Sequence, residues 1–351
     1  MSKIVAVLYP GGEKAKQVPE LLGCAENALG LRSHLEAQGH TLITTTQLDH
    51  QFDQHLADAE IVITTPFWPA YIDRKRVENA KNLKMILTAG VGSDHIDLKA
   101  AAEHHVTVAE ITGSNVVSVA EHTVMQILIL VRNFLESYQN VINGGWNIGQ
   151  VASKIHDLEG KTVGLIGMGR IGERVAHRLK PFDVDVIYYD NRHLSTVEEQ
   201  FLNVRYQRFE QVLAQSDIVS IHCPLTPATQ GLFDQNAIGQ MKKNAYLVNT
   251  ARGAIVNTND LVKALESGHL AGYAGDVWYP QPAPKDHPWR QMPNHAMTPH
   301  VSGTPLEAQK RYADGIQKCL DDFFAGKPLD RDFIIVENGE VLSPSYRYAY
   351  H

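Results

Sequence analysis

Cysteine is scarce in this sequence, which has three cysteines among 351 residues. Cys24, Cys223 and Cys319 lie far apart and form no C-x-x-C pair, which argues against a disulfide framework and a cysteine-based zinc site. We expect each of them to be a small core residue. The sequence also lacks an H-E-x-x-H segment, so we expect no bound metal.

Long apolar runs and an excess of positive charge are missing as well. The most apolar later stretch, residues 124–131, falls well short of the roughly 20 residues that cross a bilayer, so we expect no membrane segment. The net charge is −7 without charged blocks, which makes nucleic acid an unlikely class of partner. The first residues show neither a signal-peptide nor a transit-peptide pattern, and we expect a cytoplasmic protein.

Short β-branched runs alternate with segments of helical periodicity, which is typical of parallel sheets covered by helices. The first series of runs comprises residues 4–8, 41–45, 61–64, 85–88 and 106–108. The second series comprises residues 162–166, 184–189, 204–206, 218–222, 245–249 and 272–277. Because the pattern occurs twice, the predicted fold class is α/β with two doubly wound, Rossmann-like domains.

A glycine motif opens the second series. Gly167, Gly169 and Gly172 form a G-x-G-x-x-G run between a predicted strand and a predicted helix at 173–179. Glycines at these positions permit a tight turn and a close backbone approach to a pyrophosphate at the helix N-terminus. The next predicted strand ends on Asp190, whose carboxylate can accept hydrogen bonds from ribose hydroxyls. The motif therefore predicts a nicotinamide dinucleotide site.

Asp190 favours NAD over NADP, because its carboxylate would face the charged 2′-phosphate of NADP. Arg192 leaves two possibilities open, since it can pair with such a phosphate or be a solvated surface charge.

The predicted helices at 116–134 and 306–324 carry the chain between the domains, and a polar tail follows the second helix. We expect a substrate domain of residues 1–115 and 302–351, a dinucleotide-binding domain of residues 116–301, and an active site in the cleft between them. Arg252 and His300 follow predicted strand ends, where open α/β sheets bind ligands. Arg252 offers a planar fork for a carboxylate. Taken alone, His95, His104, His105 and His122 have the character of structural histidines.

The sequence resembles the NAD-dependent formate dehydrogenases of the D-2-hydroxy-acid dehydrogenase superfamily over nearly its whole length. The segments that carry the resemblance are TPF at 65–67, AGVGSDH at 89–95, TGSNVVSVAEH at 112–122, NTARG at 249–253, GDVWYPQPAPKDHPWR at 275–290 and TPH at 298–300. The resemblance implies formate as the substrate, NAD as the cofactor, a role in one-carbon metabolism and a homodimer.

The resemblance also implies roles for individual residues. Arg252 and Asn115 would hold the formate carboxylate, and Gln281 would orient His300 beside the nicotinamide. The walls of the substrate pocket would be Pro66, Phe67, Val91 and Gly92. The cofactor contacts would be Gly167, Gly169, Arg170, Ile171, Gly172, Asp190, Pro224, Thr226, Thr250, Asp276, His300, Ser302 and Gly303.

Two alternative functions share this fold. A 2-hydroxy-acid dehydrogenase, such as a glyoxylate reductase, moves a proton as well as a hydride, so its histidine needs a carboxylate partner. The neutral amide of Gln281 favours formate oxidation, which moves only the hydride. An NAD(H)-sensing protein of the corepressor type needs no turnover, and the presence of Arg252 and His300 argues against it.

Overall fold

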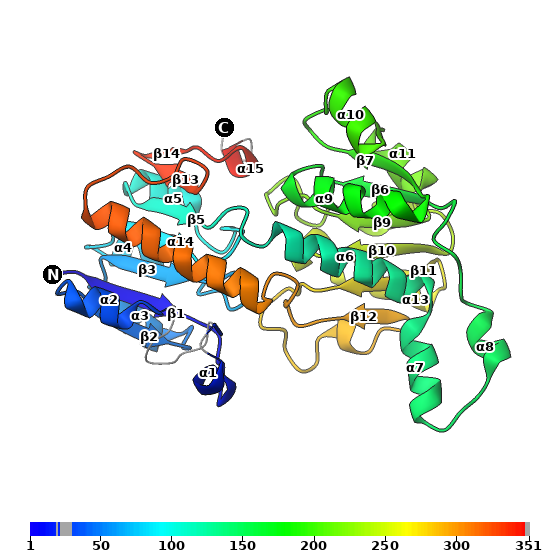
Figure 1. Ribbon diagram of the computed structural model, residues 1–351, viewed down its shortest axis with the longest axis horizontal. Coiled ribbons are helices and arrows are strands. Elements are labelled where there is room, and N and C mark those ends of the chain that lie inside the picture. Colours follow the sequence, from blue (N-terminus) through cyan, green and yellow to red (C-terminus); the bar gives the residue numbers. More distant parts are fainter. Residues whose placement is uncertain (19, 22–29, 348–351) are drawn as a thin grey trace. The chain divides into compact units, whose positions relative to one another are not determined.

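The computed structural model describes residues 1–18, 20–21 and 30–347, and Cys24 lies outside them (Figure 1). The chain divides into two compact units. Unit 1 comprises Met1–Asn115 and Gly303–His351, and unit 2 comprises Val116–Ser302. Cys319 is buried as expected, whereas Cys223 is partly exposed because it follows a strand end in a loop.

Unit 1 contains a seven-stranded sheet in the order β14-β13-β5-β4-β3-β1-β2. The five strands from β2 to β5 are parallel, and β13 and β14 are each antiparallel to their neighbour. The strands are β1 (Lys3–Val7), β2 (Thr41–Thr45), β3 (Ile61–Thr64), β4 (Met85–Thr88), β5 (Thr107–Glu110), β13 (Ile334–Glu337) and β14 (Glu340–Val341). The helices are α1 (Lys14–Gln17), α2 (Arg32–Ala37), α3 (His50–Leu56), α4 (Arg74–Asn79), α5 (Leu98–Glu103), α14 (Leu306–Phe324) and α15 (Pro344–Arg347).

Both faces of this sheet are buried, which explains why its strands are continuous apolar runs in the sequence. Ile4 and Ala6 of β1 belong to one core cluster, and Val5 and Val7 belong to a second. The first cluster also includes the buried side of α14, whose bounds match the predicted helix.

The prediction of a polar tail after α14 was wrong. Ile335 and Val336 of β13 are buried, and β13 pairs with β5. This apolar run is too short for periodicity to identify it as a strand. It forms a strand because it pairs with the edge of β5.

Unit 2 contains a seven-stranded parallel sheet in the order β12-β11-β10-β9-β6-β7-β8. The strands are β6 (Thr162–Ile166), β7 (Asp185–Tyr189), β8 (Val204–Tyr206), β9 (Ile218–Ile221), β10 (Ala245–Asn249), β11 (Leu270–Gly275) and β12 (His295–Met297). The α-helices are α6 (Val116–Val131), α7 (Phe134–Ile142), α8 (Ile148–Ala152), α9 (Arg170–Leu179), α10 (Thr196–Leu202), α11 (Phe209–Gln215), α12 (Gln235–Gln240) and α13 (Thr258–Glu266). The strand order is that of a Rossmann sheet extended by one strand, which confirms the predicted fold class.

The apolar segment predicted as one helix at 116–134 is two helices. Asn133 has a left-handed backbone with φ +47°, so α6 ends before it and α7 begins after it. Within the described residues, no single helix has the length and apolar composition to cross a membrane. Helices α6 and α7 have that length and composition only when they are taken together, and the pair is bent by 66°.

Candidate active site

The glycine motif forms the turn between β6 and α9 in unit 2. Gly167 has φ +102°, and a Cβ at this position would lie 2.6 Å from the backbone nitrogen of Cys223. A Cβ on Gly172 would lie 2.3 Å from the carbonyl oxygen of Gly167. Gly169 precedes the first turn of α9 and has no atom within 4 Å of an added Cβ. The turn therefore requires glycine and leaves open backbone at the N-terminus of α9, as a pyrophosphate site needs.

The carboxylate of Asp190 closes the same turn from the end of β7. One of its oxygens accepts a hydrogen bond from the backbone nitrogen of Met168 at 2.7 Å. The other accepts from the backbone nitrogen of Arg192 at 2.8 Å. Each carboxylate oxygen has a second lone pair, so Asp190 can still accept bonds from ribose hydroxyls.

A threonine turn follows β9, the strand beside β6. Thr226 donates its backbone N–H to the hydroxyl of Thr229 at 2.8 Å, and that hydroxyl donates to the carbonyl oxygen of Pro224 at 2.6 Å. Pro224 and Thr226 thus lie in an ordered loop at the same edge of the sheet as the glycine turn.

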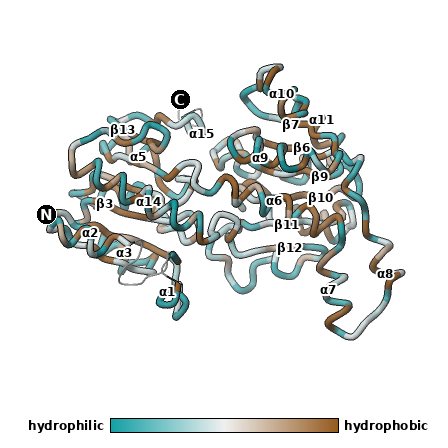
Figure 2. The backbone as a smooth tube through the Cα atoms, viewed as in Figure 1, coloured by the Kyte–Doolittle hydropathy of each residue, from teal (hydrophilic) through white to brown (hydrophobic). Residues whose placement is uncertain are grey.

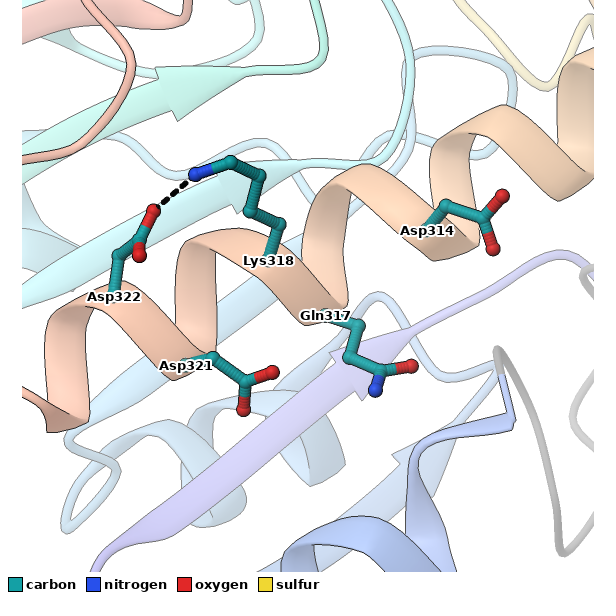
Figure 3. Close-up of a pocket in the computed structure, with 5 residues that line it drawn as sticks. All are labelled: Asp314, Gln317, Lys318, Asp321 and Asp322. Carbon is teal, nitrogen blue, oxygen red and sulfur yellow. Dashed lines mark hydrogen bonds and ion pairs between the residues drawn. The ribbon is translucent and has the colours of Figure 1, made fainter.

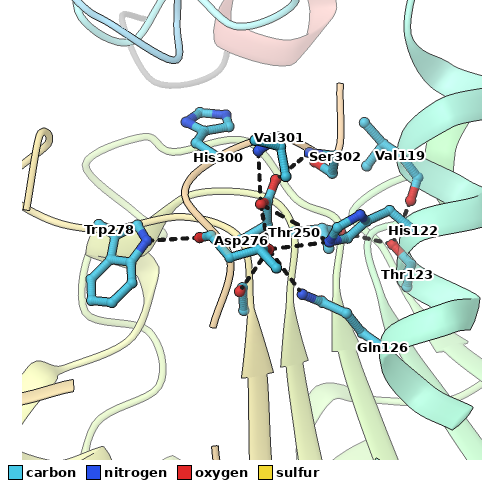
Figure 4. Close-up of polar contacts among 12 residues, drawn as sticks. Val119, His122, Thr123, Gln126, Thr250, Asp276, Trp278, His300, Val301 and Ser302 are labelled. Carbon is cyan, nitrogen blue, oxygen red and sulfur yellow. Dashed lines mark hydrogen bonds and ion pairs between the residues drawn. The ribbon is translucent and has the colours of Figure 1, made fainter. Parts of the chain in front are cut away.

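Asp276 follows β11 and is the centre of a buried polar cluster (Figure 4). Its carboxylate accepts hydrogen bonds from the hydroxyl of Thr298 at 2.6 Å and from the backbone nitrogens of Val301 and Ser302 at 2.8 and 2.7 Å. The carboxylate therefore holds the segment around His300 through two backbone amides.

Helix α6 supplies the other side of this cluster. His122 Nε2 lies 3.2 Å from the hydroxyl oxygen of Thr298 and 4.0 Å from the carboxylate of Asp276. Since that hydroxyl donates to Asp276, it accepts from His122. Burial lowers the pKa of His122, and the negative charge of Asp276 opposes the shift. His122 is therefore a neutral donor near physiological pH.

Thr250 joins the cluster from the end of β10. Thr123 donates its hydroxyl to the carbonyl oxygen of Val119, so the hydroxyl of Thr250, 2.9 Å away, donates to Thr123. Sequence reasoning missed His122, Thr123 and Gln126 as members of this cluster. The available signal was the set of polar residues at 122, 123 and 126 on one side of an otherwise apolar helix.

His300 and Gln281 form a direct pair in unit 2. Gln281 Nε2 lies 2.7 Å from His300 Nδ1, and its Oε1 lies 3.0 Å from the same atom. His300 has φ +57°, a backbone conformation that costs a non-glycine residue about 1–3 kcal/mol. Such a conformation persists only where its surroundings hold it, and Asp276 does so through Val301 and Ser302.

Arg252 follows β10 in a turn that Asn249 closes. Asn249 accepts from the backbone nitrogen of Ala251 at 3.0 Å and donates to the carbonyl oxygen of Arg252 at 2.9 Å. Arg252 Nη1 donates to the carbonyl oxygen of Ala251 at 2.8 Å. Asn249 therefore fixes the backbone of the turn that carries Arg252 at the end of β10.

Unit 1 holds the remaining predicted site residues. Glu110 is buried and accepts from the backbone nitrogen of Gly92 at 2.9 Å, which positions the loop that also contains Val91. The ring of Phe67 contacts Tyr9 edge-on with centroids 5.8 Å apart. Asn115 is buried, and its Oδ1 has no hydrogen-bond partner among the described residues. In all, unit 1 contains Pro66, Phe67, Val91, Gly92, Asn115 and Gly303, and unit 2 contains the other predicted site residues.

A pocket on the exposed side of α14 includes none of these residues (Figure 3). It is lined by Asp314, Gln317, Lys318, Asp321 and Asp322. Lys318 pairs with Asp322 one turn further along the helix, an arrangement typical of a solvated helix surface.

Comparison with known proteins identifies the family. Residues 124–302 match the family model described as D-isomer specific 2-hydroxyacid dehydrogenase, NAD binding domain. The mitochondrial formate dehydrogenase of Solanum tuberosum is 52% identical over 98% of this chain and 91% of its own length.

Solved structures agree with this match. A formate dehydrogenase of Granulicella m. is 44% identical, with a TM-score of 0.94 over 97% of this chain and 100% of its own. The NAD-dependent formate dehydrogenase of Staphylococcus aureus, solved in complex with NAD, is 49% identical, with a TM-score of 0.89 over 95% of this chain and 99% of its own. The chain therefore belongs to the formate dehydrogenase family of the D-isomer specific 2-hydroxyacid dehydrogenases.

Proposed function

We propose that this protein oxidises formate with NAD, transferring a hydride from the formate carbon to nicotinamide C4 and releasing CO2 and NADH. The observation that carries the proposal is the contact of 2.7 Å between the amide of Gln281 and the ring of His300. An amide N–H donated to Nδ1 leaves the proton on Nε2, so that a neutral His300 can donate a hydrogen bond to a formate oxygen. The relatives named above support the same activity.

The residues of unit 2 fit a dinucleotide. The open backbone of the turn at Gly167 and Gly169 suits a pyrophosphate, with Arg170, Ile171 and Gly172 in the first turn of α9. Asp190 would accept from the adenosine ribose, and Pro224 and Thr226 would border the adenine. Around the nicotinamide half we place Thr250, Asp276, His300 and Ser302 of unit 2, together with Gly303. NAD supplies the hydride acceptor, and the protein supplies binding and orientation.

Formate is a small carboxylate anion. We propose that Arg252 pairs with the formate carboxylate through its planar fork and that the amide of Asn115 donates to it. The substrate would be enclosed by Pro66, Phe67, Val91 and Gly92. These residues exclude water while the negative charge leaves the substrate, which strengthens the electrostatic contribution of Arg252.

The proposal is tested by following NADH absorbance with formate, D-lactate and glyoxylate as substrates. Because formate oxidation moves no proton, kcat for formate should stay nearly flat between about pH 6 and 9. A hydroxy-acid dehydrogenase would prefer D-lactate or glyoxylate and would show a rate that titrates. An NAD-sensing protein would bind NAD and turn over none of the three.

Substitution at Gln281 sharpens this test. Gln281→Glu places a carboxylate beside His300 and favours the imidazolium, so it should introduce a pH dependence that the parent lacks. Gln281→Asn is the neutral control and should lower the rate without a new pH dependence. A parent whose kcat for formate already changes tenfold per pH unit in this range contradicts the mechanism.

We also propose a homodimer formed through α7. This helix has no buried residue, and several of its apolar side chains are exposed. They are Phe134, Leu135, Tyr138, Val141 and Ile142. Figure 2 colours parts of α7 as hydrophobic. Contiguous exposed apolar side chains of this kind mark association surfaces. Sedimentation should give a dimer for the parent and a monomer for Val141→Asp combined with Ile142→Asp, and a monomeric parent would refute the proposal.

Finally, we propose that this enzyme lies in the cytoplasm and acts in one-carbon metabolism. We propose no nucleic-acid or membrane partner for it. The unpaired thiols of Cys223 and Cys319 suit a reducing compartment, and formate is a one-carbon acid. Fractionation of cells that express the natural gene tests the location.

A further inference from the structure

The loop after β7 holds Arg192 in a defined place beside Asp190. The backbone nitrogen of Arg192 donates to the Asp190 carboxylate at 2.8 Å. Two residues later, the backbone nitrogen of Leu194 donates to the hydroxyl of Tyr188 at 2.9 Å. Hydrogen bonds at Arg192 and Leu194 thus tie the loop to Asp190 and to β7, so the backbone that carries the guanidinium is fixed.

Two further carboxylates flank that guanidinium. Glu173, in the first turn of α9, has an oxygen 3.7 Å from Arg192 Nη2, and Glu198, in α10, has one 3.9 Å from the same nitrogen. The other oxygen of Glu198 accepts from the backbone nitrogen of Ser195 at 2.7 Å in a capping box, which fixes its position. The side chains of Arg192, Glu173 and Glu198 are 66%, 39% and 46% exposed, so a ligand can reach them.

From the sequence, Arg192 could be either a partner for a 2′-phosphate or a solvated surface charge. Its guanidinium is not isolated in solvent, because the carboxylates of Glu173 and Glu198 lie 3.7 and 3.9 Å from Nη2 and compete with a phosphate for it. Burial raises the pKa of the Glu173 carboxyl, and the positive charge of Arg192 opposes that rise.

We infer that Glu173 and Glu198 are specificity-determining residues that act with Asp190 to exclude dinucleotides carrying a 2′-phosphate. They do so by occupying Arg192 and by repelling the phosphate directly. The inference rests on the proposed binding of NAD in unit 2. A phosphate monoester carries nearly two negative charges at neutral pH, so each nearby carboxylate weakens its binding, whereas the uncharged ribose hydroxyl of NAD is nearly indifferent to them.

The test compares two fragments, ADP-ribose and 2′-phospho-ADP-ribose, by titration calorimetry on the full chain at about pH 8 and low salt, where Glu173 is ionised. Glu173→Gln and Glu198→Gln preserve side-chain shape, and glutamine can maintain the capping box. Each should raise the affinity for 2′-phospho-ADP-ribose about threefold, and the double variant about tenfold, with the affinity for ADP-ribose changed less than about twofold. The gain should shrink at about 0.5 M salt.

Two controls separate this effect from a general change of charge. Glu266→Gln removes an exposed carboxylate from α13 of the same unit and should change neither affinity. Arg192→Ala, added to the double variant, should remove the part of the gain that the released guanidinium supplies and leave the part that comes from lost repulsion.

Three results would overturn the inference. It fails if the ratio of the two affinities is the same in the parent and the double variant, or if Glu266→Gln changes the ratio equally. If the parent does not bind ADP-ribose at all, the proposed dinucleotide site fails and this inference fails with it. Binding of ADP-ribose with an unchanged ratio leaves the proposed function standing and refutes the role of Glu173 and Glu198 alone.

Discussion

Replacing Asp276 by Asn should destabilise unit 2 and misplace His300. Asp276 accepts three hydrogen bonds from Thr298, Val301 and Ser302 while fully buried. An amide has one acceptor oxygen. If that oxygen keeps its bonds to Thr298 and Val301, the new NH2 group faces the backbone N–H of Ser302, and two donors then oppose each other without a partner.

The magnitude follows from this count. A buried donor left without a partner costs about 1–3 kcal/mol, and the loss of charge-assisted bonds adds to it, so we expect about 3 kcal/mol less stability. For a domain as large as unit 2, this lowers the melting temperature by roughly 6–12 °C. Because the bonds to Val301 and Ser302 hold the strained backbone of His300, kcat for formate should fall at least about tenfold.

Calorimetry and steady-state kinetics on the same preparations measure both effects. Asp286→Asn, which makes the same atomic change at an exposed position, should leave both values unchanged. Removing a buried charge can also stabilise a protein when desolvation outweighs hydrogen bonding. An Asp276→Asn protein that melts at or above the parent temperature with full activity would show that desolvation dominates and would refute the reasoning.

Two further outcomes are expected. Arg252→Ala should lower kcat/KM for formate at least about 100-fold, because no other cation is proposed to hold the carboxylate. Arg252→Lys should give an intermediate kcat/KM. A kcat/KM of Arg252→Ala within about tenfold of the parent would remove Arg252 from the site. Burial lowers the pKa of His222 to about 3, so the unfolded state binds more protons below about pH 6.5, and stability should decline by up to about 1.4 kcal/mol per pH unit as the solution is acidified. His222→Asn should flatten this decline in melting temperature between about pH 7 and 5, and parallel curves for parent and variant would contradict the assignment.

The features that the sequence alone predicted are those with a local physical cause. Apolar runs buried on both faces of a sheet identify β1, β3 and β10, since their pattern depends only on neighbouring residues. The strand β13 was missed because its few apolar residues acquire a role only beside the edge of β5. The break at Asn133 was missed because a left-handed residue leaves no mark on hydrophobic periodicity.

The same division holds for the candidate site. The sequence by itself determined the turn at Gly167 and the acceptor at Asp190, because tight turns and strand ends restrict which residues can occupy them. Only the tertiary structure decided that His122 donates to the hydroxyl of Thr298 beside Asp276 and that Glu173 flanks Arg192. These pairs are distant in the sequence, and the contact of each depends on how a helix packs beside a strand end, which no local pattern records.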